Sequence, residues 1–249
     1  MRKQEETINY PEKGIRDAPL HRMFTAVPRR YDLVNHVITW GFDKRWRWKA
    51  ARECFTSPSE KLLDLCCGTG DLVINMARLA KDGVELAALD YSQPMLTIAT
   101  KKAAILAGGK KITFVYGDAA NLPFSDGYFD CIGISFALRN LTYKNPLARQ
   151  HIAEVLRVLN LGGRFVIVET SQPKTKLIRK LFHLYLRRFV FMIGYRLSGN
   201  RGAYFYLVES AARFYSADEL KQLLMTAGFR QVSFRPVFFG AVGICVAVK

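Results

Sequence analysis

The sequence predicts an α/β fold built on a doubly wound, seven-stranded sheet with a C-terminal antiparallel hairpin. The first observation is the stretch 61–71, KLLDLCCGTGD, in which an apolar strand runs into a tight glycine turn and a helix. The second is the alternation of four further apolar strands with helical patterns, which is typical of parallel sheets. The third is a pair of strand-like segments at 232–239 and 243–248, which predicts the hairpin.

The other elements follow from local patterns along the chain. The predicted parallel strands lie at 62–67, 84–89, 112–116, 129–135 and 164–169. Helices are expected after the glycine turn and at 92–106 and 145–159, where apolar residues recur at helical spacing. The last helix begins at a capping box formed by Ser216 and Glu219 and ends at Gly228. In such a sheet the ligand crevice lies beyond the carboxyl ends of the strands.

Length and composition indicate one domain. The chain has 249 residues, half of them hydrophobic, which is enough for one large core. We expect a flexible N-terminal tail at 1–22 and a single domain at 23–249. Within that domain, 23–55 predicts a helical cap over the crevice and 170–210 a basic insertion that faces the substrate or a membrane.

The cysteines and the apolar runs exclude several classes of protein. Five cysteines without a C-x-x-C pair argue against a disulfide framework and a zinc site, so no metal is expected. The N-terminus is polar and the uncharged run at 237–248 has only 12 residues, which predicts neither a signal peptide nor a transmembrane span. We therefore expect a cytoplasmic protein.

The charge distribution indicates an anionic partner. The formal net charge is +16, and no acidic residue occurs from 170 to 208. A second basic cluster lies at 29–52. Charge of this size favours nucleic acid or an anionic membrane surface as a partner.

The glycine loop favours one cofactor class over another. A dinucleotide site needs a third glycine three residues after Gly70, but that position is Val73. Asp71 lies where a pyrophosphate would bind, and its carboxylate would repel the phosphates. S-adenosylmethionine carries a sulfonium and an ammonium instead of phosphates. The loop Gly68-Thr69-Gly70 with Asp71 therefore favours S-adenosylmethionine.

Two further acids follow strands of the predicted sheet. Asp90 ends the second strand twenty residues beyond Gly70, the offset at which an acid accepts hydrogen bonds from ribose hydroxyls. A simpler role for Asp90 is to cap the next helix. Asp118 and Ala119 end the third strand, where a carboxylate and backbone amides suit the edge of an adenine.

Several motifs give the chain a resemblance to a known family. They are Tyr31-Asp32 with Asn35, the stretch 63–71, Ala120-Asn121-Leu122-Pro123-Phe124, and above all ISFALRN at 134–140. With these motifs the chain resembles the quinone C-methyltransferases of ubiquinone and menaquinone biosynthesis, which are Rossmann-like class I methyltransferases dependent on S-adenosylmethionine. The resemblance covers residues 23–249.

The resemblance implies roles for particular residues. The cofactor would be bound at the glycine loop and by Thr69, Asp90, Asp118, Ala119 and Ser135. The substrate would be a prenylated quinol, with Arg139 and Asn140 placed to stabilise its phenolate and Tyr31 and Asp71 nearby. A structural role for Arg139, pairing with a carboxylate to brace the loop, is the alternative.

Other functions remain open at this stage. An RNA methyltransferase would explain the basic charge, but an N-P-P-Y-like turn after the fourth strand and an RNA-binding module are missing. Nucleic acid is therefore not expected as a partner. A small-molecule methyltransferase of the same fold and a non-catalytic scaffold that binds S-adenosylmethionine are further alternatives. The sequence leaves open whether the acceptor is a naphthoquinol or a methoxybenzoquinol, and whether the protein forms homodimers or binds partner enzymes.

A basic segment predicts how such an enzyme reaches a lipid substrate. On a helical wheel, one stripe holds Lys176, Arg179, Lys180, His183 and Arg187, and the other side holds Ile178, Leu181, Phe182, Tyr185, Phe189 and Met192. This pattern is typical of a helix that lies in the headgroup plane of a membrane. We expect peripheral association with an anionic membrane through residues 174–196. A core helix with a solvated basic stripe is the alternative.

Overall fold

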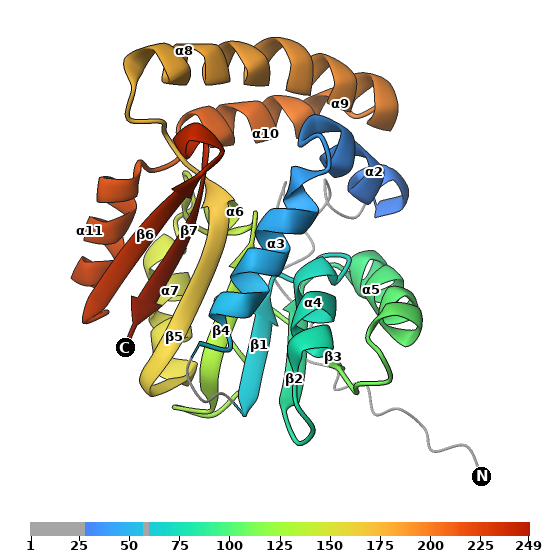
Figure 1. Cartoon of the computed structure of the whole chain (residues 1–249), viewed down its shortest axis with the longest axis vertical. Helices are drawn as coiled ribbons and strands as arrows, with labels where there is room; N and C mark the ends of the chain where they lie inside the picture. The colour runs from blue at the N-terminus through green and yellow to red at the C-terminus, as the bar shows by residue number, and fades with distance from the viewer. Residues whose placement is uncertain (1–27, 57–59) are drawn as a thin grey trace.

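The computed structural model describes residues 28–56 and 60–249, so the tail predicted at 1–22 lies outside the described residues. Its centre is one seven-stranded sheet with the order β3-β2-β1-β4-β5-β7-β6 (Figure 1). β7 runs antiparallel to β5 and β6, and the other neighbours are parallel. The strands are β1 (Lys61–Leu65), β2 (Glu85–Asp90), β3 (Thr113–Tyr116), β4 (Phe129–Ser135), β5 (Leu159–Thr170), β6 (Gln231–Val237) and β7 (Val242–Val248). The predicted fold class is confirmed.

Helices cover both faces of the sheet because each face is apolar. Apolar side chains of α3 (Phe42–Glu53), α4 (Asp71–Leu79) and α5 (Gln93–Leu106) share a core with one face. Those of α7 (Ala148–Val158) and α11 (Ala217–Ala227) share a core with the other. The strand order reverses between β1 and β4, and such a reversal opens a crevice at the carboxyl ends of the strands.

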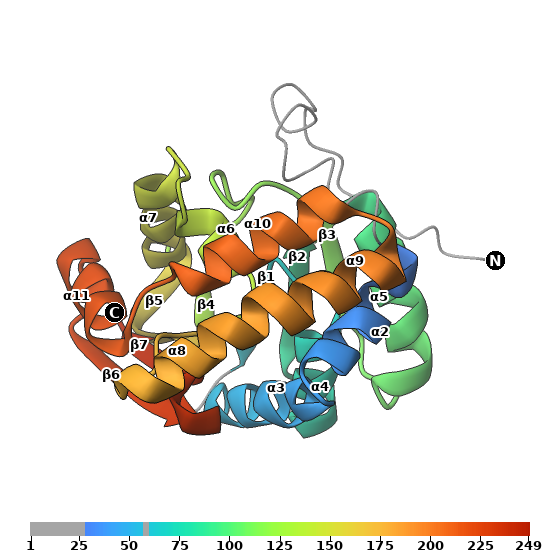
Figure 2. The same cartoon turned by 90° about the horizontal axis from the view of Figure 1, so that it is seen from above.

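A layer of helices, called the roof below, lies across these carboxyl ends (Figures 1 and 2). It consists of α8 (Lys176–Tyr185), the π-helical turn η1 (Leu186–Val190), α9 (Phe191–Ser198) and α10 (Arg201–Ala212). A Cβ added at Gly194 on α9 would come within 2.0 Å of the Tyr204 ring on α10, so glycine allows these two helices to pack closely. From the cap, α2 (Pro28–Ile38) packs against α9.

The predicted faces of the basic segment are partly wrong. Leu181 and Met192 are exposed, although they were expected on the same side as Phe182 and Tyr185. His183 is half-buried and its Nε2 lies 2.8 Å from Gln172 Oε1, so it is not part of the exposed basic stripe in which it was expected. For Leu181 and His183 the reason is that α8 packs through one narrow face only. For Met192, which follows the π-helical turn, that turn shifts the helical phase by about one residue.

Two predicted boundaries also differ. The helix expected at 145–159 is α7, which begins later, at Ala148, and a short helix that was not expected, α6 (Leu138–Thr142), precedes it. β5 begins at Leu159, before the two glycines expected to precede it, because the chain stays paired with β4 through a shift of register. The capping box is confirmed, since Ser216 Oγ accepts from the Glu219 amide and the Glu219 carboxylate accepts from the Ser216 amide.

Candidate active site

The glycine loop has the backbone conformation that its residues predict. Gly70 has a φ of 81° and precedes α4, and a Cβ there would lie 3.1 Å from Ala99 Cβ. Gly68 has a φ of 54°, which is also unfavourable for other residues. Its amide donates to Asp90 Oδ2 at 2.8 Å. The loop is therefore held against the end of β2, with its backbone facing the crevice.

Asp90 is buried and anchored by backbone amides. Besides the Gly68 amide, it accepts from the Ser92 amide at 2.8 Å. Burial raises the pKa of Asp90 to about 6, although these amides act in the opposite direction. The capping role also considered for Asp90 is not present, because Ser92 is the N-cap of α5 and Asp90 binds the amide of that residue, ahead of the helix. The carboxylate retains lone pairs for further donors.

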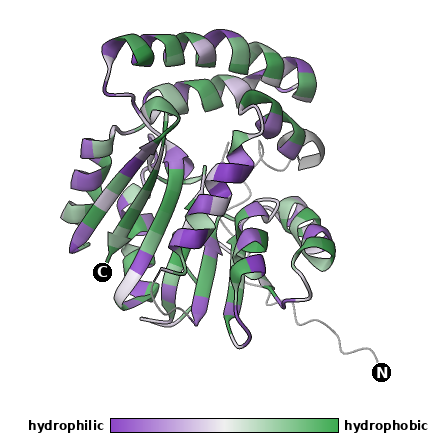
Figure 3. Ribbon diagram, viewed as in Figure 1, coloured by the Kyte–Doolittle hydropathy of each residue, from purple (hydrophilic) through white to green (hydrophobic). Residues whose placement is uncertain are grey.

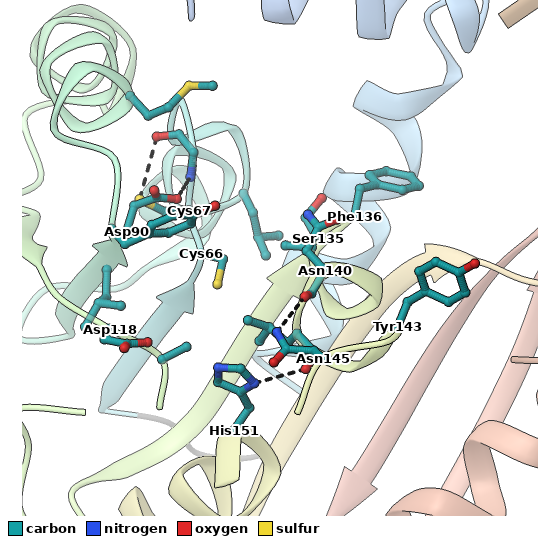
Figure 4. Close-up of a pocket in the computed structure, with 18 of the residues that line it drawn as sticks. Cys66, Cys67, Asp90, Asp118, Ser135, Phe136, Asn140, Tyr143, Asn145 and His151 are labelled. Carbon is teal, nitrogen blue, oxygen red and sulfur yellow. Dashed lines mark hydrogen bonds between the residues drawn. The ribbon is translucent and has the colours of Figure 1, made fainter. Parts of the chain in front are cut away.

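A large cavity opens above the carboxyl ends of the strands (Figure 4). Its volume is about 710 Å³, within the usual range for small-molecule sites. Asp90 and Asp118 lie on one side of it, and Ser135, Phe136 and Asn140 lie across from them (Figure 4). Of the predicted cofactor residues, all except Gly70 line it, namely Gly68, Thr69, Asp90, Asp118, Ala119 and Ser135.

These walls fit S-adenosylmethionine. Four carboxylates line the cavity, at Asp71, Asp90, Asp118 and Glu209. The three aspartates follow strands of the sheet and suit the cationic groups and hydroxyls of this cofactor. Asp118 is fixed in place because its Oδ1 accepts from the Ala120 amide at 2.9 Å. A phosphate-bearing cofactor would meet the same carboxylates at repulsive range.

The cap contacts the glycine loop through charged side chains. Thr69 Oγ1 donates to Asp32 Oδ1 at 2.7 Å, and Lys102 Nζ bridges Asp32 and Asp71 at 2.8 and 2.5 Å. Burial lowers the pKa of Lys102, but Asp71 and Asp32 together raise it above its usual value. The predicted catalytic residue Asp71 is therefore a partner of Lys102, which sequence reasoning missed because α5 and α2 are distant in the chain.

Arg47 forms a second connection from the cap. Its Nε donates to Ser135 Oγ at 3.0 Å, and its guanidinium pairs with Asp43 and lies 3.5 Å from Asp71. The guanidinium carbon also lies 5.3 Å from the centre of the Phe136 ring. Arg47 was not singled out from the sequence, because only tertiary packing brings α3 to the end of β4. Tyr31 belongs to α2, but its side chain lies outside the described part of the structure.

The two residues expected to stabilise a phenolate face different surroundings. Asn140 lines the large cavity. Arg139 is buried, and its NH1 donates to Glu169 Oε1 and to the carbonyl of Phe136, both at 2.9 Å. The ion pair with Glu169 is the bracing contact considered as the alternative for Arg139. A catalytic role for Arg139 stays a prediction.

A second cavity, of about 100 Å³, lies between the cap, the roof and the ends of β5 and β7. Arg47 and Phe136 line both cavities, and Arg139 lines this one. Most of the remaining wall is apolar and comes from both layers, with Ile38, Trp46, Phe182, Tyr185, Leu186 and Val190 among its residues. The pattern of the roof segment predicted apolar residues at some of these positions, but not an enclosed cavity.

Sequence reasoning also missed part of the large cavity. Its wall continues to Tyr143 and His151, and to Phe205 and Tyr206 on α10. His151 Nδ1 lies 3.0 Å from the carbonyl of Leu141, and burial lowers the pKa of this histidine, which favours a neutral ring at pH 7. No motif marks these positions, since they reach the cavity only through folding of α7 and the roof.

Comparison with known proteins identifies the family. The model of the ubiE/COQ5 methyltransferase family matches residues 12–249. A demethylmenaquinone methyltransferase of Thermus thermophilus is 37% identical over 225 residues, which are 90% of this chain and 98% of that protein. The ubiquinone/menaquinone biosynthesis C-methyltransferase UbiE of Geobacter sulfurreducens is 34% identical over 238 residues, 96% of this chain and 90% of that protein.

Solved structures share the fold at lower identity. A SAM dependent methyltransferase from Aquifex aeolicus has a TM-score of 0.56 and 18% identity, covering 81% of this chain and 88% of that one. This likeness shows a shared fold. The family-model match over 12–249 and the two relatives confirm the family and the cofactor expected from the glycine loop. The chain belongs to the ubiE/COQ5 methyltransferase family and is an S-adenosylmethionine-dependent methyltransferase.

Proposed function

We propose that this enzyme methylates a ring carbon of a prenylated quinol, either demethylmenaquinol or the corresponding methoxybenzoquinol. The names of the two relatives support this substrate class. The observation that carries the proposal is the shape of the site. The large cavity continues beyond the residues predicted to bind the cofactor to the aromatic side chains of α10, and an apolar cavity adjoins it across Arg47 and Phe136.

The chemistry requires an electron-rich ring beside the cofactor. Bound S-adenosylmethionine supplies an electrophilic methyl group on a sulfonium. Asp71, Asp90 and Asp118 would bind and orient the cofactor, and the roof would exclude water from the reacting face. Asn140 would contact the ring oxygen, whose negative charge grows as its proton leaves. Arg139 would act at the edge of the second cavity, with Glu169 fixing the direction of its guanidinium.

The second cavity suits the first part of a prenyl tail. Its aliphatic and aromatic wall residues come from the cap and the roof, and the Trp40 and Phe189 rings stack 5.8 Å apart where these layers meet. An apolar tail buried there would contribute about 0.8 kcal/mol per buried CH₂ group. A longer prenyl tail would extend from this cavity to the protein surface between the cap and the α8–η1 segment of the roof.

We also propose that the roof contacts an anionic membrane. α8 has no buried residue, and Leu177, Leu181 and Leu184 are 65%, 57% and 54% exposed on its outer side. Exposed basic residues lie beside them, at Lys176, Lys180 and Arg187. Hydrophobic and hydrophilic residues alternate along the ribbon of this layer in Figure 3. Outward leucines next to lysines fit the boundary between acyl chains and headgroups.

Within residues 28–56 and 60–249, no helix combines the length and the apolarity needed to cross a bilayer.

Methyl transfer to defined quinols tests the proposed activity. The purified protein would be incubated with labelled S-adenosylmethionine and with reduced demethylmenaquinone or the reduced methoxybenzoquinone, each with a short prenyl tail. We expect one labelled methyl group on a ring carbon of one or both products, located by NMR. Label on a ring oxygen, or label transferred to RNA while neither quinol is methylated, would contradict the proposal.

A further inference from the structure

Two polar atoms in the wall of the large cavity are buried without a hydrogen-bond partner among the described residues. They are Oδ1 of Asn140 and the phenolic oxygen of Tyr206. Leaving a buried polar group unpaired costs about 1–3 kcal/mol, and native structures contain few such groups. Because both residues line the same cavity, a ligand bound there is a candidate partner for both atoms.

The two atoms come from opposite layers of the site. Asn140 lies on α6, directly after β4 and its loop, whereas Tyr206 lies on α10 in the roof. The Tyr206 ring is 6.4 Å from that of Tyr143, which also lines the cavity. A ligand that met both atoms would therefore lie between the sheet and the roof, beside Phe136.

The chemistry of the two atoms is complementary. Burial raises the pKa of Tyr206, although nearby Arg139 acts in the opposite direction, so its hydroxyl stays protonated at neutral pH and can donate. Asn140 Oδ1 only accepts. A ring hydroxyl is the small group that both donates a hydrogen bond and accepts one.

The cofactor is the less suitable partner for these atoms. The groups that suit its ribose and adenine, at Asp90 and Asp118, lie across the cavity from Asn140 (Figure 4). On the side of Tyr206 the wall includes the aromatic rings of Phe205 and Tyr143, together with the carboxylate of Glu209. Such a wall fits the planar ring of the acceptor.

We propose that Asn140 and Tyr206 form a binding site for one ring hydroxyl of the quinol, which donates to Asn140 Oδ1 and accepts from the Tyr206 hydroxyl. This proposal rests on the proposed function. It assigns to α10 a direct contact with the acceptor, so the roof binds the ring as well as covering it.

Tyr206→Phe tests the site, because it removes only the hydroxyl and keeps the ring. We expect KM for the quinol to rise about tenfold, the equivalent of one net hydrogen bond of roughly 1.4 kcal/mol. Affinity for S-adenosylmethionine, measured by calorimetry, should stay unchanged. Tyr195→Phe is the matched control, because that side chain is exposed on α9 and lines neither cavity.

A second measurement uses acceptor analogues in the presence of S-adenosylhomocysteine. Each of the two ring hydroxyls would be replaced by hydrogen in turn, and binding to wild type and Tyr206→Phe compared as a double-mutant cycle. The analogue that lacks the hydroxyl bound by Tyr206 should bind wild type about tenfold more weakly than the full quinol does. Because it has no group for Tyr206 to contact, it should bind wild type and Tyr206→Phe with equal affinity.

The outcomes separate this proposal from the proposed function. If wild type and Tyr206→Phe methylate the quinol equally well and bind every analogue alike, the hydroxyl site is wrong while the function stands, and an ordered water would then satisfy the two atoms. If wild type methylates neither quinol, the function is wrong and the hydroxyl site falls with it. A loss of cofactor affinity in Tyr206→Phe would assign the tyrosine to the cofactor and overturn the site.

Discussion

The lower and the upper walls of the large cavity are built differently. In the lower wall, formed by the strand ends and the loops after β1, β2 and β3, Asp90 and Asp118 are fixed by backbone amides of these loops. In the roof, Tyr206 leaves its hydroxyl unpaired within the described structure, and α8 buries no residue. The comparison teaches that the wall proposed to bind the cofactor is held by internal hydrogen bonds, whereas the wall proposed to bind the acceptor leaves polar and apolar groups available for a ligand.

Arg139, in the wall of the second cavity, gives the largest expected effect. Arg139→Ala should lower kcat on the order of 100-fold, the loss typical of one electrostatic stabiliser, with cofactor affinity intact. The variant should also lose roughly 3–5 kcal/mol of unfolding free energy, because Glu169 would stay buried without its partner. Steady-state kinetics and denaturant unfolding measure the two effects.

A double variant separates bracing from catalysis. Arg139→Met combined with Glu169→Gln removes both charges of the pair and should recover most of the unfolding free energy. Activity should remain low. Recovery of kcat together with stability would show that Arg139 only braces the loop.

The outer face of the roof gives the next largest effect. Changing Lys176, Lys180 and Arg187 to Gln should weaken binding to anionic vesicles by about 3 kcal/mol, since each basic residue contributes about 1 kcal/mol. Liposome flotation measures this difference. The matched control changes Lys81, Lys101 and Lys111 to Gln, which removes the same charge from exposed positions near β2, β3 and α5.

If wild type and both triple variants float equally with anionic vesicles, the proposed membrane contact of α8 is wrong. The lipid substrate would then have to reach the enzyme by another route.

The lower wall gives a smaller effect, confined to the cofactor. Asp90→Ala should weaken S-adenosylmethionine binding by about 2–3 kcal/mol, the scale of hydrogen bonds to a charged group, while the fold survives. Calorimetry measures the affinity, and Asp82→Ala is the control because Asp82 is exposed. Unchanged affinity in Asp90→Ala would remove Asp90 from the site.

The pH dependence of binding sharpens this prediction. The pKa of Asp90 is about 6 in the folded protein, so the carboxyl is mostly protonated below that pH and ionised above it. Ribose hydroxyls donate more strongly to the ionised form. Affinity of the wild type should therefore rise as the pH increases from 5 to 7, and Asp90→Ala should lose this dependence.

The parts of the molecule that sequence reasoning predicted are those determined by short segments. The glycine loop, Asp90 and the capping box at Ser216 depend on neighbours within a few residues or on one strand-to-strand offset. Other contacts depend on helices packing across the sheet. They are the hydrogen bond of Arg47 to Ser135, the ion pair of Lys102 with Asp71, and the position of Tyr206 in the cavity wall. Local periodicity contains no information about such packing, and for the same reason it assigned Leu181 to the wrong side of α8.

The close packing of α9 on α10 at Gly194 has a mechanical consequence. Because the Tyr204 ring fills the space that a side chain would need, a slide of one helix past the other would break this close packing, and we expect the two helices to move together as one rigid body. The same body carries the outward leucines of α8, through the continuous helix of α8, η1 and α9, and the Tyr206 hydroxyl. If the leucines insert into a membrane leaflet and Tyr206 binds the quinol ring, this rigid body fixes the distance between the leaflet surface and the bound ring.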